Sequence, residues 1–455
     1  MIEKISSINE NEERAVAYGN IVNLYGSDVA KALEDHMAIY DDRFYLWLAD
    51  LYDPGEYDES GNPSGGGFYY SNSARDNFGF YIDVESTMQA LGFLEKSGML
   101  GAYGGSLKVA IPQRMQNELT SFALSLQSDE DGYFYHKQWG RDIAPARRGR
   151  DLGWSTQLLK KFEVLPYWNT PNGHMGSLGA PRADKSNEKS EHKSKWPQYL
   201  ETPEVWRKYL TEYTSEISQK SYPIGHVIAE QAGEIRGREA EAIANGEPTG
   251  YLEITKEIFN ARQLSENGLW QPETSYASVN GLMKIMAIYN SFGIKFNHAE
   301  AAFDSAVKII LLDRVDALGK AVTGSVDVYN PWIAITRIFE NVNNYGSENE
   351  VRKMREKLRE NAADMIRTTT QKTLKFQKPD GSYGYTLDYS PKKSQGVNVA
   401  VPETVEGDVN GGTIALCGVT NNMLDALGIK GVSIYYPSDF ERFIERAMKR
   451  KHIEK

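Results

Sequence analysis

The chain has 455 residues, of which 40% are hydrophobic and 25% are charged, a composition typical of a folded protein that excludes general disorder. Its 51 basic and 62 acidic residues give a formal net charge of −11, which argues against a binder of nucleic acid or anionic membranes. Aromatic residues make up 11% of the chain, with 27 tyrosines and 8 tryptophans beside 40 glycines. This combination indicates loops that carry aromatic rings and bind a flat ligand.

Cysteine and histidine are sparse. Cys417 is the only cysteine, which excludes an intramolecular disulfide and a cysteine-rich zinc site. The seven histidines show no His-x-x-x-His or His-x-His spacing, so we expect no nitrogen- or sulfur-bound metal and no cofactor, while oxygen-ligated calcium stays open. The first twenty residues lack an apolar signal core, and no apolar run approaches the roughly 18 residues of a membrane span. As written, the chain predicts a soluble cytoplasmic protein without a membrane partner, although a chain whose export signal had been removed would read the same way.

Apolar residues at spacings of three and four predict helices along most of the chain. Thr202 is expected to cap a helix with Pro203 in its first turn, Asn330-Pro331 to open another, and Ser438 to cap the last one. Sustained strand alternation is almost absent. Further helices are predicted over about 28–51, 82–98, 112–127, 153–163, 223–243, 251–264, 275–292, 298–312, 349–375 and 411–427.

Three of these helices are followed by a similar turn and then by aromatic residues. The turns are Asp131-Gly132, Asn267-Gly268 and Asp380-Gly381, and Gly61–Tyr81 is a looser, glycine-rich version. Four unrelated turns are the alternative, because Asp-Gly is common in turns. The recurring order instead indicates a repeated unit of helix, turn, aromatic cluster and helix.

Repeated pairs of antiparallel helices predict an all-α protein with the architecture of an α/α toroid. In this fold an inner ring of helices is wrapped by an outer ring, and the loops at one end line a cup. The polar, lysine-rich stretch 179–202 is the best candidate for a linker, but it reads equally as a long surface loop. We therefore predict a single domain over residues 1–455.

One turn adds a resemblance to a known architecture. The segment Gln377–Tyr383 (QKPDGSY) resembles the Q-x-x-D-G-S-W repeat of terpene cyclases and protein prenyltransferases, which are α/α toroids. The motifs of their chemistry are missing: there is no D-x-D-D, the run after Asp41-Asp42 departs from D-D-x-x-D, and Cys417 has no spaced zinc partner. The resemblance supports the fold, and terpenoid cyclisation is kept only as a further alternative.

A second resemblance covers Phe80–Leu159. It runs through Ile82–Glu85 (IDVE), Asp131–His136 (DGYFYH) and Arg148–Trp154 (RGRDLGW), whose order and approximate spacing are similar to the unsaturated glucuronyl and rhamnogalacturonyl hydrolases. Those enzymes are α/α barrels with a catalytic Asp opening a helix, a G-L-x-Y-H turn and a W-x-R-G-N-G-W segment. The resemblance implies a carbohydrate-active enzyme in which Asp83 is catalytic. The arginine-rich run departs from the family pattern, and fewer residues precede Asp83 than in that family.

Candidate site residues cluster in this region. Asp83 is expected at a loop-to-helix junction, where it is either a catalytic acid or an acid at the helix N-terminus that complements the helix dipole. Tyr135 and Trp139 are candidates for stacking on sugar rings, and His136 for binding a carboxylate or moving a proton. Each is alternatively a packed side chain under a loop.

Four arginines at positions 141, 147, 148 and 150 form the densest basic run of an acidic chain. Arginine binds carboxylates through paired hydrogen bonds, so Arg148 and Arg150, with the nearby Trp154, are expected to contact a uronic acid. Salt bridges to Asp142 and Asp151 within the same segment are the alternative.

Later loops supply further candidates. His174 lies in a glycine-rich loop, and His226 and Glu230 lie one helical turn apart, which suits either an acid–base pair or an ordinary helix. The acidic, glycine-containing segment 397–412 is expected either to bind sugar hydroxyls or to cap a helix that begins near Gly411. The remaining predicted residues are Glu403 and Asp408 as catalytic groups and Asn410, Trp270, Glu273, Tyr276 and Tyr383 as substrate contacts.

These features predict an enzyme that cleaves an oligosaccharide or polysaccharide containing uronic acids. A glycoside hydrolase, which uses two carboxyl groups, is slightly favoured over a lyase that acts by β-elimination. The non-enzymatic alternative is a glycan-binding toroid. The sequence gives no indication of the oligomeric state.

Overall fold

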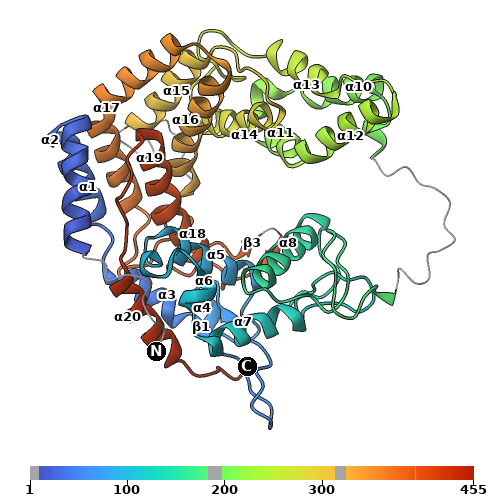
Figure 1. Ribbon diagram of the computed structural model, residues 1–455, viewed down its shortest axis with the longest axis vertical. Helices are drawn as coiled ribbons and strands as arrows, with labels where there is room; N and C mark the ends of the chain where they lie inside the picture. The colour runs from blue at the N-terminus through green and yellow to red at the C-terminus, as the bar shows by residue number, and fades with distance from the viewer. Residues whose placement is uncertain (1–9, 183–196, 313–323, 395) are drawn as a thin grey trace.

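The computed structural model describes residues 10–182, 197–312, 324–394 and 396–455, which form mostly helices (Figure 1). The predicted all-α class is confirmed. Part of the predicted surface loop 179–202 lies outside the described residues. The sheets of the described part are two antiparallel pairs of short strands, β1 (Tyr52–Asp53) with β2 (Gly67–Phe68) and β3 (Lys393–Ser394) with β4 (Val397–Asn398).

One set of helices packs side by side in a row, which we call the inner row. Neighbours in the row come from distant parts of the chain, because the last helical segments pack against helices near the N-terminus. In order of contact the row consists of α11 (Ile217–Glu230), α14 (Tyr276–Phe292), α16 (Val326–Tyr345), the α18–α19 segment (Val409–Thr413 and Val419–Leu427), α5 (Val84–Lys96) and α8 (Pro145–Lys161).

The other long helices cover this row. Helix α7 packs on α8, α12 on α14, α15 on α16, and α17 on both α16 and α19, so the chain alternates between the two layers over much of its length. Figure 1 shows the helices following a curve, with α20 lying beside α3 where the chain returns. The covering helices are α1 (Glu10–Tyr25), α2 (Ser27–Met37), α3 (Asp42–Asp50), α7 (Gln113–Ser125), α10 (Pro203–Tyr213), α12 (Ala232–Asn245), α13 (Tyr251–Asn260), α15 (Ala299–Leu311), α17 (Glu348–Leu374) and α20 (Pro437–Met448).

Adjacent helices of the inner row run in the same direction. Their hydrogen bonds and ion pairs join early residues to early residues and late residues to late residues. The pairs are Glu85–Arg147 and Glu95–Lys161 between α5 and α8, Gln89–Asn410 and Lys96–Asn421 between α5 and α18–α19, and Asn280–Asp327 and Asn290–Arg337 between α14 and α16. The N-terminal ends of these helices, which carry positive partial charge, therefore gather at one end of the row.

Glycine allows the closest helix contact in the row. A Cβ atom on Gly281 of α14 would lie 2.0 Å from the hydroxyl oxygen of Ser221 on α11, and one on Gly225 would lie 2.8 Å from a side-chain carbon of Ile285. Any larger residue at Gly281 would push the two helices apart. This close approach brings side chains of α11 and α14 to a common face.

Two predicted helix starts are wrong. Helix α16 begins at Val326, and Pro331 lies inside it, where its missing N–H removes a single hydrogen bond in the second turn. Helix α20 is capped by Tyr436 rather than Ser438, because Pro437 occupies the first helical position, which suits its fixed φ. Thr202 caps α10 as predicted, through a hydrogen bond from the Val205 N–H.

Some predicted helices are divided or displaced. The region 28–51 holds two helices, α2 and α3, with Asp41 capping the second. The region 223–243 spans the end of α11 and most of α12. The helix expected near Gly411 begins at Val409 with Asp408 as its cap, and a π-helical turn, Ile414–Gly418, joins α18 to α19.

The three repeated turns have the backbone that their glycines predicted. Gly132, Gly268 and Gly381 all have positive φ, at 74°, 67° and 86°, a conformation that favours glycine. The first and third turns are closed by isolated strand-like pairing, which joins Gln127 to Phe134 in one case. The aromatic residues that follow these turns include several that pack into the core, as described below.

Candidate functional site

The carboxyl group of Asp83 lies at the start of α5. It accepts hydrogen bonds from the backbone N–H of Ser86 at 2.9 Å and from the Ser86 hydroxyl at 2.6 Å, so it caps the helix. Asp83 is only 2% exposed. Burial raises its pKa to about 6, even though the nearby Arg147 favours the ionised form. The group is therefore an acid of unusual pKa that is shielded from solvent.

Glu85 holds two arginines of α8 beside this cap. It accepts from Arg147 at 2.8 Å and from the Nε of Arg150 at 2.9 Å. Arg147 is fully buried and also pairs with Asp151 at 2.8 Å, whereas the Arg150 side chain is 37% exposed. The predicted salt bridge to Asp151 thus belongs to Arg147, and Arg150 is fixed at one side while its other side reaches solvent.

Asp408 plays the same structural part at the start of α18 as Asp83 does for α5. It accepts from the backbone N–H groups of Gly411 at 2.7 Å and Tyr385 at 2.8 Å, and burial raises its pKa to about 6. Its neighbour Asn410 is partly exposed and accepts from Gln89 of α5 at 3.1 Å. Asp408 therefore holds the loop of Tyr385 against the inner row.

Charged side chains from the far end of the row approach Arg150. Burial lowers the pKa of His226 on α11 below its usual value, and the positive charges of Lys284 and Arg150 lower it further, against an opposing effect of Glu230. The imidazole Nδ1 lies 3.5 Å from the Glu230 carboxylate. Arg150 of α8 is thus among the charges that influence His226 of α11, the helix at the other end of the inner row. Because its pKa is lowered, His226 is uncharged at neutral pH.

Tyrosine hydroxyls gather beside these charges. The pKa of Tyr385 is raised to about 12, chiefly by burial and also by the neighbouring Tyr222 and Asp327. Asp327 likewise raises the pKa values of Tyr222 and Tyr276, and it accepts from Asn280 at 2.9 Å. These tyrosines therefore stay protonated and are able to donate a proton or a hydrogen bond.

The structure brings several predicted residues to this face and adds others. Arg150, Asn410 and Tyr276 come from three different helices, and Trp154 lies on α8 with its ring 5.9 Å from the Arg150 guanidinium. Tyr222, Tyr385, Asp327 and Lys284 were not predicted. We refer to this set as the inner face: Arg150, Trp154, Tyr222, His226, Glu230, Tyr276, Lys284, Asp327, Tyr385 and Asn410.

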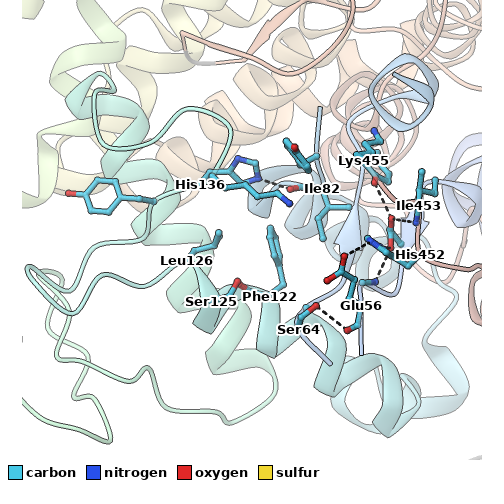
Figure 2. Close-up of a pocket in the computed structure, with 17 residues that line it drawn as sticks. Glu56, Ser64, Ile82, Phe122, Ser125, Leu126, His136, His452, Ile453 and Lys455 are labelled. Atoms are coloured by element: carbon cyan, nitrogen blue, oxygen red, sulfur yellow. Dashed lines mark hydrogen bonds and ion pairs between the residues drawn. The ribbon is translucent and has the colours of Figure 1, made fainter. Parts of the chain in front are cut away.

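A separate cavity of about 300 Å³ is lined by Ile82, the residue before Asp83, and does not include Asp83 itself (Figure 2). The predicted residues Tyr135 and His136 line it, opposite His452, which pairs with the buried Asp53 at 2.9 Å. His136 bonds to the backbone oxygen of Ile82 at 2.7 Å, and burial lowers its pKa to about 4. His136 is therefore uncharged and contacts a different space from Arg150.

Trp139 links the two regions. Its ring stacks on His136 with centroids 4.1 Å apart, and the Arg147 guanidinium lies 4.8 Å from it on the side of Asp83. Arg148 instead lies over the ring of Tyr133, at 4.8 Å. The aromatic loop thus builds a wall between the cavity and the buried cap of α5.

The remaining predicted residues lie elsewhere. Trp270 and Tyr383 are each 1% exposed and donate hydrogen bonds to backbone oxygens, so they pack as core residues. Glu403 is exposed and has a positive φ of 59°, and Glu273 is also exposed. His174 is partly buried in its own loop, where its backbone N–H donates a hydrogen bond to the Thr170 hydroxyl oxygen at 3.0 Å.

Two properties of the described residues concern metal binding and membrane spanning. No group of three or more His, Cys, Asp or Glu side chains there is arranged to hold a metal ion. Within the same ranges, none of the helices combines the length and apolar character needed to cross a membrane. Comparison of the chain with models of known families, with curated proteins and with solved structures finds no match.

Proposed function

We propose that the protein is an α/α toroid that binds and cleaves an acidic, uronate-containing oligosaccharide along its inner face. The single observation that carries this proposal is the position of Arg150. It is held by Glu85 on one side, and its charge acts on His226, Lys284 and Tyr385 from three other segments. An anchored but accessible guanidinium is suited to bind a carboxylate.

The parallel inner row supports the toroid. The charge of Arg150 on α8 influences His226 on α11 at the other end of the row, and the covering helices alternate with the row along the chain. The inner face would then line the centre of a ring, with Asn410 and Tyr276 near the positive ends of their helices and Arg150, His226 and Lys284 further along theirs. Such an arrangement favours an anionic ligand although the whole chain is acidic.

The accessible groups favour β-elimination over hydrolysis. In this reaction Arg150 would bind the uronate carboxylate and stabilise the negative charge that develops on it. The uncharged His226 would remove the proton at C5, the electrons of that C–H bond would form the C4–C5 double bond, and the C4–O bond would break. The hydroxyl of Tyr385 or Tyr222 would protonate the leaving oxygen. All these side chains are at least partly exposed.

Hydrolysis is the second candidate, and the observation that favours it is the pKa of about 6 at both Asp83 and Asp408. A carboxyl group with such a raised pKa is suited to act as a general acid near neutral pH. Both groups are 2% exposed or less, and each accepts one helix N–H and one further hydrogen bond, from the Ser86 hydroxyl for Asp83 and from the Tyr385 N–H for Asp408. They would have to leave these caps to touch a substrate.

A panel of uronate-containing oligosaccharides, with a neutral oligosaccharide as control, tests the proposal. Elimination produces a double bond conjugated with the carboxylate, so ultraviolet absorbance and reducing ends should rise together. New reducing ends without absorbance would indicate hydrolysis, and loss of absorbance from an unsaturated substrate would indicate an unsaturated-uronyl hydrolase. Absence of any reaction across the panel would contradict the proposal.

A pair of arginine variants locates the site. We expect Arg150→Gln to lower kcat/KM by about 10- to 100-fold, the value of a lost charge-assisted hydrogen bond. Arg148→Gln is the matched control, because Arg148 lies over Tyr133 outside the inner face. Equal effects of the two substitutions would place the substrate elsewhere.

A further inference from the structure

Two more cationic side chains lie further from the N-terminal ends of the inner-row helices than Arg150 does. Arg150 is the sixth residue of α8, Lys284 the ninth of α14 and Arg337 the twelfth of α16. Because neighbouring helices run in parallel, each lies further from the N-terminal ends than the one before. The Arg337 guanidinium donates to the backbone oxygen of Met283 at 2.5 Å, which anchors it beside Lys284.

Among the described residues, neither Lys284 nor Arg337 forms an ion pair with a buried carboxylate of the kind that Glu85 forms with Arg150. In the described part of the chain, Lys284 pairs with the carboxylate of Glu230 at 3.8 Å, and that side chain is 65% exposed. Burial lowers the pKa of Lys284, and Arg337 and Arg150 lower it further while Glu230 raises it. Burial also lowers the pKa of Arg337, against a smaller opposing effect of Glu340. Lys284 and Arg337 are thus two neighbouring cations in a partly desolvated place, with Glu230 as the main opposing charge on Lys284.

We propose that Lys284 and Arg337 form a second anion-binding subsite, so that the ligand of the inner face carries at least two negative groups. This inference rests on the proposed function and extends it by naming a polyanionic oligosaccharide as the substrate class. The charge of Arg150 is already balanced by Glu85. The role of Arg150 is therefore to orient one carboxylate of the ligand through hydrogen bonds. Lys284, whose partner Glu230 is 65% exposed, and Arg337, which is anchored by a backbone oxygen, would bind a second carboxylate or a sulfate.

The subsite is tested with two oligosaccharides of equal length at constant salt. In one every residue is a uronate, and in the other uronates alternate with neutral sugars. Binding is measured as Kd by calorimetry and cleavage by ultraviolet absorbance. The variant is Lys284→Met, which removes the charge, with Lys284→Arg as the variant that keeps it. Lys256→Met is the control, because Lys256 lies on the covering helix α13 and pairs with Glu253.

We expect Lys284→Met to weaken binding of the all-uronate ligand about tenfold and that of the alternating ligand by less than about twofold. Lys284→Arg should restore tight binding, and the control should match the wild type. Equal weakening for both ligands, or no weakening for either, would overturn the subsite. If the wild type binds both ligands but cleaves neither, the proposed function fails while the ratio of the two Kd values still decides the subsite. If it binds neither ligand, both proposals are contradicted.

Discussion

Titratable side chains lie in two regions of the inner row, and the two regions use them differently. One region is the start of α5 and of α18, and the other is the middle of α11 and of α14. Asp83 and Asp408 are buried, accept backbone N–H groups and have pKa values raised to about 6. His226 and Lys284 have side chains that are 45% and 20% exposed, and they interact with charges on other helices. A perturbed pKa therefore marks both regions, and accessibility separates a helix cap from a group that can meet a ligand.

The largest expected effect is on the buried region. Arg147→Ala would leave Glu85 and Asp151 without their shared buried partner, and we expect it to lower the free energy of unfolding by about 3–5 kcal/mol. Denaturant titration measures this value. Arg148→Ala, at the neighbouring accessible position, should change it by less than about 0.5 kcal/mol. Similar losses in the free energy of unfolding for the two variants would contradict the distinction between buried and accessible side chains.

A smaller, pH-dependent effect is expected at Asp83. Because its folded pKa of about 6 lies above the usual aspartate value of 3.8, the carboxyl group favours folding below pH 3.8, and this contribution is lost as pH rises through 6. The loss amounts to about 3 kcal/mol. Asp83→Asn removes the titration and keeps a capping oxygen.

The stability difference between Asp83→Asn and the wild type should therefore shift by about this amount in favour of the variant between pH 4 and pH 7. Denaturant titrations at the two pH values provide the measurement. A difference that stays constant with pH would show that Asp83 ionises in the folded protein as it does in water.

A smaller loss of stability is expected when the helix cap at Asp408 is removed. Asp408→Ala removes the acceptor of the Gly411 and Tyr385 N–H groups, and Asp408→Asn keeps one. We expect the alanine variant to be less stable than the asparagine variant by about 1 kcal/mol, with faster hydrogen exchange at Gly411. Equal stability of the two variants would mean that the side chain does not hold this loop.

The smallest effect is expected at Glu403. It is exposed, and its positive φ of 59° would be equally strained in alanine. Glu403→Ala should change the free energy of unfolding by less than about 0.5 kcal/mol and leave activity unchanged. A large loss of activity would extend the functional region to the loop before α18.

Much of the helical structure could be predicted from the sequence, because apolar spacing and caps are local. Thr202 and the three Asp/Asn-Gly turns were read correctly, and Asp408 as a cap was one of two readings that the sequence left open. The inner face could not be predicted in the same way. Lys284 stands alone in an apolar helix, and its neighbours Arg150 and Arg337 are far away in sequence, so only the packing of α8, α14 and α16 brings them together.

The aromatic loops show the same limit. Trp270 and Tyr383 follow predicted turns, but their rings enter the core, whereas Tyr385, two residues further along, contributes to the inner face. The side of a loop on which a ring lies depends on contacts with distant helices. Local spacing therefore identified aromatic loops without identifying which rings are accessible.

The central claim is that the accessible inner face, and not the buried caps, carries the chemistry. Its most direct test compares initial rates of His226→Gln and Asp83→Asn on one uronate oligosaccharide that the wild type cleaves. Our account predicts that His226→Gln loses at least about 100-fold in kcat and that Asp83→Asn stays within about threefold of the wild type. An inactive Asp83→Asn beside an active His226→Gln would contradict it and assign the reaction to the carboxyl groups.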